Sequence, residues 1–117
     1  WVSDLAFNQR TTFLGDGHSE QIILAQDWLM DNFSKAKLMV PGHGSAQTAP
    51  FPMVSKTRDY VQRLRDAMEK AVDDGVGIYD AVRDVEFSDW KDTYLYQENH
   101  KANANFIYLE MEQALFE

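Results

Sequence analysis

The sequence contains no cysteine, which excludes disulfide bonds, thiolate nucleophiles and cysteine-ligated zinc. It also has no apolar run near the roughly 18 residues that a membrane span requires, so no membrane partner is expected. Basic residues are few: 11 Lys and Arg stand against 19 Asp and Glu, and the net charge of −8 argues against nucleic acid as a partner. A cysteine-free chain suits any redox compartment, so the localisation stays unknown.

The composition is that of a folded protein, because 44% of the 117 residues are hydrophobic and 26% are charged. This length fits one domain or part of one. The chain opens with Trp1 and has no charged leader followed by an apolar stretch. Residues 1–3 resemble the last part of a strand, so we expect the chain to be a piece of a longer protein.

Hydrophobic spacing predicts one βαβ unit at the start of the chain. Apolar residues at helical intervals indicate a helix over residues 20–33, with Ser19 as its N-cap. The short apolar run 37–40 precedes Pro41 and predicts a buried strand. A strand, a helix and a strand in this order imply parallel strands joined by a right-handed crossover.

The rest of the chain is predicted to be helical. The expected helices are 56–73, 78–85 and 102–116, with Gly75 and Gly77 ending the first of them. We therefore divide the chain into a βαβ part, 1–52, and a helical extension, 53–117. The expected fold class is α/β, with a helix-rich second half.

Two residues of the βαβ part are candidate metal ligands. His43 follows the predicted strand between two glycines, which leave space beside the imidazole. Asp4 follows the other strand, so both side chains are expected at one edge of the sheet, where they could share a metal ion. The alternative is that His43 only forms a turn and that Asp4 is a solvated loop residue.

Two motifs resemble the last two metal-binding motifs of the metallo-β-lactamase-fold hydrolases: Ser3-Asp4-Leu5-Ala6-Phe7-Asn8 and Val40-Pro41-Gly42-His43-Gly44. The tail is similar to that of a subgroup of metallohydrolases associated with quinoprotein and sulfur-oxidation systems. The tail residues concerned are His100-Lys101-Ala102-Asn103 and Tyr108-Leu109-Glu110-Met111-Glu112.

The resemblance implies the C-terminal portion of an αβ/βα sandwich with a dinuclear zinc site, although iron or manganese is possible. Asp4 would bridge the two metals and His43 would bind the second. In the full-length parent, metal-activated water would attack an ester, thioester or amide-type bond of a small-molecule substrate. The subgroup also suggests a soluble protein that is periplasmic or exported.

This chain departs from the family pattern in two ways. Ser3 stands where the family has glycine, and the family's upstream His-x-His-x-Asp-His motif is absent, since the only histidines are His18, His43 and His100. A catalytic zinc needs about three protein ligands. We therefore expect the chain alone to be inactive, with no catalytic residue of its own, and to require the missing N-terminal half of the fold.

Other polar residues carry weaker expectations. His18 and Arg10 lie in the loop after Asp4 and are candidate substrate-binding residues, although surface roles suit both. His100 is expected before the last helix, as a surface or packing residue. Trp28 and Trp90 are expected to pack in or beside the core.

The alternative function is a non-catalytic helical interaction module, favoured by the helix-rich second half. Removing half of a sandwich would leave apolar side chains uncovered, and we expect these to include Val2, Leu38 and Val40. The chain is therefore predicted to self-associate through the face of its βαβ unit.

Overall fold

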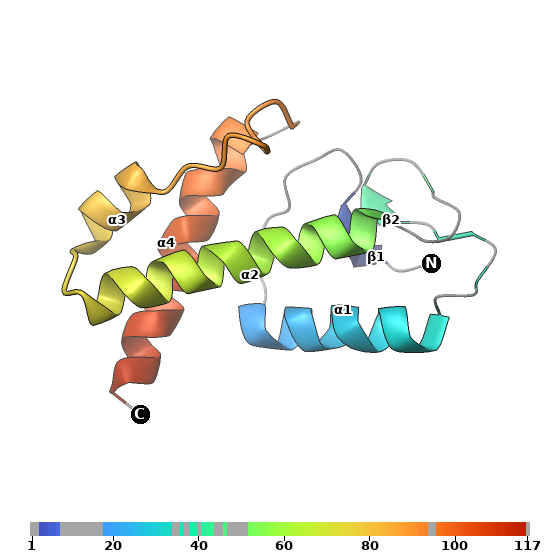
Figure 1. The fold of residues 1–117 in the computed structure, drawn as a ribbon, viewed down its shortest axis with the longest axis horizontal. Coiled ribbons are helices and arrows are strands. Elements are labelled where there is room, and N and C mark those ends of the chain that lie inside the picture. Colours follow the sequence, from blue (N-terminus) through green and yellow to red (C-terminus); the bar gives the residue numbers. More distant parts are fainter. Residues whose placement is uncertain are drawn as a thin grey trace.

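Helices dominate the residues that the structure describes, and they enclose most of its buried side chains (Figure 1). The structure is a computed structural model that describes residues 3–7, 18–33, 36, 38–39, 41–43, 46, 52–93 and 96–116. In chain order the elements are β1 (Ser3–Phe7), α1 (Ser19–Phe33), β2 (Pro41–His43), α2 (Pro52–Asp73), α3 (Ile78–Asp84) and α4 (Tyr96–Leu115).

The expected α/β class is wrong. The described helices have 15, 22, 7 and 20 residues, whereas the two strands have 5 and 3. A two-stranded sheet of this size cannot form a layer of a sandwich, because it has too little surface on which to bury helices. The protein is a helical protein with four helices in its described part, and β1 and β2 are a minor addition.

The helices pack mainly on one another, with α2 at the centre of the arrangement. Figure 1 shows α1 and α2 side by side and running in opposite directions, while α4 crosses α2 and α3 lies beside α4. The main core lies between α2, α3 and α4 and receives Ile23 from α1. A smaller second core joins Leu29 of α1 to Met39 and to the start of α2 at Met53 and Val54.

The end of α2 confirms the predicted role of Gly75. Gly75 has a φ of +74°, a left-handed conformation that L side chains adopt only with strain. The amide of Gly75 bonds to the carbonyl of Val72, and the amide of Val76 bonds to that of Ala71. This pair of bonds is a Schellman motif, which satisfies carbonyls that the end of the helix would leave unpaired.

The other helix boundaries differ from the prediction mainly at their starts. α2 begins at Pro52, where a residue without an N–H suits the first turn, and α4 begins at Tyr96 instead of residue 102. Ser19 is the first residue of α1, and its hydroxyl bonds to distant side chains. The early start of α4 brings His100 inside the helix. The division of the chain at residue 52 stays a prediction.

Candidate functional site

Asp4 and His43 belong to two strands that pair in parallel, as the βαβ prediction required. Ser3 pairs with Pro41, and Phe7 pairs with His43. The strand positions differ from the prediction, because Asp4 lies inside β1 and His43 is the last residue of β2. Asp4 and His43 therefore lie on neighbouring strands, whose backbones are about 4.8 Å apart.

The donor types of Asp4 and His43 suit zinc, but two ligands do not complete a site. The side chains of both residues lie outside the described part of the chain, as do Arg10, Val2 and Val40. Within the described part, no group of three or more His, Cys, Asp or Glu residues could hold a metal ion. A zinc ion bound at Asp4 and His43 therefore needs ligands beyond those that the described residues supply.

His18 lies exposed at the start of α1, where it lines an open pocket of about 240 Å³. The lining residues come from the start of α1, from α2 and from the end of α4: His18, Glu20, Arg65, Glu110, Met111, Gln113 and Ala114. The lining thus contains no strand residue. The structure places the predicted substrate-binding His18 beside charged helix residues and does not bring it together with Asp4 or His43.

The charged groups of this pocket bind one another through the buried Ser19. The Ser19 hydroxyl donates to Glu110 Oε2 at 2.5 Å and accepts from Arg65 Nη1 at 2.6 Å. The Glu110 carboxylate also accepts the Ser19 backbone N–H at 3.4 Å, which satisfies a free donor at the positive end of α1. These groups already satisfy one another's hydrogen bonds. We therefore interpret the cluster as a structural contact that connects α1, α2 and α4.

A second polar cluster lies deep in the core and centres on His100, which is only 2% exposed. The hydroxyl of Tyr60 lies 2.8 Å from His100 Nδ1, and His100 Nε2 lies 2.9 Å from the carbonyl oxygen of Val85. A carbonyl only accepts, so Nε2 carries the proton and Nδ1 accepts from Tyr60. Asn103 Nδ2 in turn donates to the Tyr60 oxygen at 3.2 Å.

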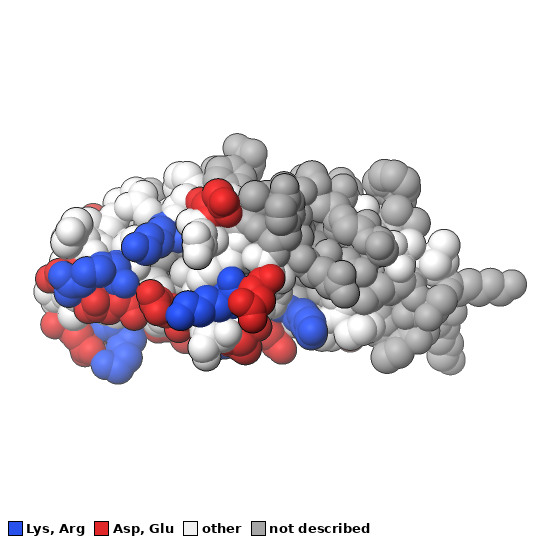
Figure 2. Space-filling model, turned by 90° about the horizontal axis from the view of Figure 1, so that it is seen from above, with Lys and Arg blue, Asp and Glu red and all other residues white. Residues whose placement is uncertain are grey.

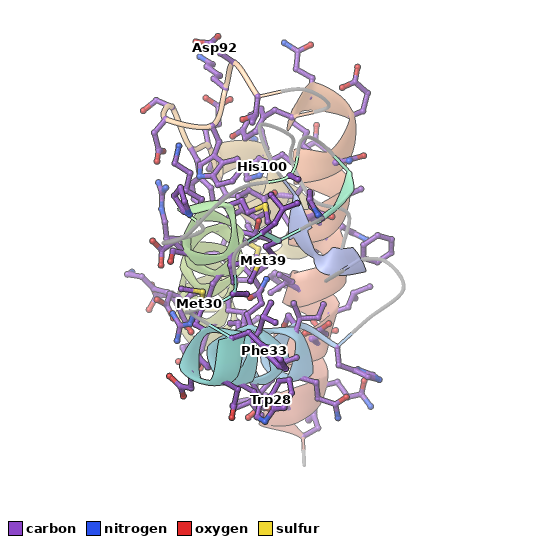
Figure 3. The ribbon with its side chains drawn as sticks, turned by 90° about the vertical axis from the view of Figure 1, so that its right-hand side faces the viewer. Trp28, Met30, Phe33, Met39, Asp92 and His100 are labelled. Atoms are coloured by element: carbon purple, nitrogen blue, oxygen red, sulfur yellow. The ribbon has the colours of Figure 1, made fainter. Side chains whose placement is uncertain are left out.

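Aromatic rings enclose this imidazole. Tyr96 stacks on it with a centroid separation of 4.4 Å, and Phe87 and Tyr60 contact it at 5.0 and 5.7 Å. Burial disfavours the charged form and lowers the pKa of His100, while burial raises the pKa of the Tyr60 hydroxyl. Both groups are therefore held neutral at neutral pH. Figure 3 labels His100 among the packed side chains.

The prediction missed this cluster because it placed the start of the last helix too late. With α4 starting at Tyr96, the residues Tyr96, His100, Asn103 and Ile107 follow helical spacing, and all four are buried. That spacing was present in the sequence, but the helix was predicted to begin only at residue 102, after Tyr96 and His100. His100 was expected to be either a surface residue or a packing residue, and its burial confirms the second alternative.

The helical surface carries both signs of charge without segregating them. On the face that Figure 2 shows, basic and acidic side chains lie next to one another. Several form pairs, among them Arg63 with Asp89 at 2.8 Å and Lys70 with Asp74 at 2.5 Å. Exposed pairs of this kind contribute little to stability. Among the described helices, none is long and apolar enough to cross a membrane.

Comparisons with known proteins returned no family model that matches the chain, and neither the curated proteins nor the solved structures yielded a similar one.

Proposed function

We propose that this chain supplies part of a metal-dependent hydrolytic centre, with Asp4 and His43 as two of its metal ligands. The family resemblance implies that the remaining ligands would come from a preceding half of the fold. The single observation that supports the proposal best is the parallel pairing of β1 and β2, since it sets Asp4 and His43 on adjacent strands.

The local sequence also suits such a site. The glycine at position 42 leaves space for a ligand beside His43, and Asp4 belongs to the stretch that resembles a metal-binding motif. A bound zinc ion would lower the pKa of a water molecule and polarise the bond to be hydrolysed. The proposed contribution of this chain is one carboxylate ligand and one imidazole ligand, from residues on paired strands.

The substrate class proposed is a small molecule with an ester, thioester or amide-type bond. His18 and Arg10 remain the candidate substrate-binding residues. The pocket beside His18 also contains Arg65, a cation that could attract a substrate carboxylate, but Ser19 and Glu110 already engage it. We therefore assign no part in substrate recognition to Arg65.

The coding sequence that precedes Trp1 tests the proposal most cheaply. We expect it to encode a His-x-His-x-Asp-His motif, which would supply the missing ligands. The full polypeptide should then hydrolyse a panel of ester, thioester and amide substrates, and Asp4→Asn should abolish turnover. A preceding sequence without the motif, together with a full polypeptide that binds no metal, would contradict the proposal.

The second candidate function is an interaction module, which an apolar strip on α1 favours. The strip consists of Leu24, Trp28 and Phe33, which are 61%, 58% and 47% exposed. Trp28 and Phe33 contact each other edge to face with centroids 5.3 Å apart, and Figure 3 shows Trp28 on the outer side of α1. The expectation that Trp28 packs in or beside the core is therefore wrong.

We propose a second copy of the chain as the occupant of this strip. Self-association was expected through the strand face of the βαβ unit, of which Leu38 is 56% exposed, whereas the strip lies on the helix of that unit. The net charge of −8 opposes association, but repulsion is screened beyond about 8 Å at physiological salt. Three side chains on one helix fall short of the roughly 800 Å² per partner of a standard interface, so the dimer should be weak.

Sedimentation equilibrium at tens of micromolar tests this candidate. The wild-type chain should show a concentration-dependent mixture of monomer and dimer, and Trp28→Glu should be monomeric. Tyr79→Glu is the matched control, because Tyr79 is an even more exposed aromatic residue, at 77%, on α3 and outside the strip. A wild-type chain that stays monomeric, or a dimer that Trp28→Glu leaves intact, counts against the interaction module.

A further inference from the structure

The His100 cluster joins three parts of the chain through one imidazole ring. His100 belongs to α4, its Nδ1 accepts from Tyr60 of α2, and its Nε2 donates to Val85, which caps the end of α3. Tyr96, one turn earlier on α4, accepts the backbone N–H of Phe87 at 2.8 Å. α4 is thereby tied both to α2 and to the segment that follows α3.

The hydrogen bonds of the cluster run in one direction and depend on a neutral ring. Asn103 donates to the Tyr60 oxygen, Tyr60 donates to Nδ1, and Nε2–H donates to the Val85 carbonyl. A proton on Nδ1 removes the acceptor for the Tyr60 hydroxyl. The rings of Phe87 and Trp90, which also contact Tyr60, offer the hydroxyl hydrogen no strong acceptor in its place.

We propose that His100 is an acid-sensitive latch, whose neutral imidazole holds α4 against α2 and the segment after α3, and whose protonation releases these contacts. This inference concerns the helical half of the chain and does not depend on the metal-site proposal.

The charged groups that face His100 from each packed element do not compensate for a buried positive charge. Glu86, in the segment after α3, favours the protonated ring, whereas Arg63 of α2 and Lys101 of α4 disfavour it. Arg63 is engaged with Asp89 and lies over the Phe87 ring with its guanidinium carbon 4.2 Å from the centroid. Burial is the largest influence, and it lowers the pKa of His100.

The direction of the pH effect follows from this lowered pKa. In the unfolded chain His100 takes up a proton near its ordinary pKa of about 6.5, whereas in the folded chain it stays neutral to lower pH. The unfolded state therefore binds more protons below about pH 6.5, and stability falls as the pH drops through that range. The contribution of His100 is fully present above about pH 6.5 and is lost below it.

Urea unfolding followed by far-UV circular dichroism between pH 8 and 5 tests the latch. Below about pH 6.5 the unfolding equilibrium constant of the wild-type chain should rise by up to about tenfold per pH unit relative to that of His100→Gln. Glutamine keeps a donor and an acceptor but does not titrate. His18→Gln is the matched control, because His18 is exposed at the start of α1, and it should keep the wild-type slope.

A second measurement keeps the proposal testable if His100→Gln does not fold. The ring resonances of His100 in the wild-type chain, followed by NMR, should show no titration until the protein opens. Backbone amides of α4 should then exchange faster with solvent at pH 5.5 than those of α1, after correction for the intrinsic pH dependence. A folded-state titration of His100 near pH 6.5 would overturn the proposal, and so would equal slopes for wild type and His100→Gln.

Discussion

Replacing Tyr60 by Phe removes one oxygen atom from the core and leaves the ring in place. The ring of Tyr60 contacts Phe87 and Trp90 with centroids 5.7 and 5.0 Å away, and Tyr60→Phe keeps both contacts. Its effect on stability therefore reports the hydrogen bonds of the hydroxyl alone, since the volume of the core hardly changes.

The hydroxyl makes two hydrogen bonds, to His100 at 2.8 Å and from Asn103 at 3.2 Å. Without it the Nδ1 atom of His100 stays buried with no donor, and a buried unsatisfied group costs about 1–3 kcal/mol. The longer bond from Asn103 adds less. We expect Tyr60→Phe to lower the free energy of unfolding by about 2–3 kcal/mol.

Tyr108→Phe is the matched control for this substitution. The Tyr108 hydroxyl donates to the carbonyl of Val76 at 2.7 Å, and Val76 is exposed at the turn after α2. Water can replace the lost donor there, so the expected cost is only about 0.5–1 kcal/mol. Urea unfolding with an unchanged m-value measures both variants. Equal losses for the two variants would contradict this expectation, because the buried network would then contribute no more than the part-buried hydrogen bond of Tyr108.

The remaining predictions concern the end of α2 and metal binding. Gly75→Ala should lower the free energy of unfolding by about 1 kcal/mol because φ is +74° there, although no atom lies within 4 Å of the added methyl group. Gly77 has a φ of −66° and equally open space, so Gly77→Ala should change the free energy of unfolding by less than about 0.5 kcal/mol. Similar losses for the two variants would show that the left-handed φ of Gly75 is not the cause. The isolated chain should bind zinc only weakly in a calorimetric titration, since Asp4 and His43 are two ligands; tight stoichiometric binding by the monomer would contradict this.

The sequence predicted the helices well where one face alone is apolar. α2 has such a face, with Tyr60, Leu64 and Met68 buried along it, and Gly75 marks its end. In α1 the apolar residues surround the helix: Ile23 and Leu29 are buried, while Leu24 and Trp28 are exposed. Periodicity cannot select between two apolar faces, so Trp28 was assigned to the wrong one.

The fold class and the polar core required information that local patterns do not contain. Two short apolar runs suggested a sheet layer, but the strands have only 5 and 3 residues, and the main core among the described side chains comes from the helices and the segment after α3. The partners of His100 lie 40 and 15 positions away along the chain, so its hydrogen bonds could not be read from its neighbours. The parallel pairing of the two strands that carry Asp4 and His43, in contrast, followed from the order of the elements alone.

If His43 is a metal ligand, its replacement should lower the metal content of the full polypeptide. Elemental analysis of purified protein should find metal in the wild type and a clear loss of it in His43→Ala, with circular dichroism showing that both remain folded. His18→Ala should keep the wild-type metal content, because His18 lies among helix residues at the pocket. An unchanged metal content in His43→Ala would show that His43 is not a metal ligand.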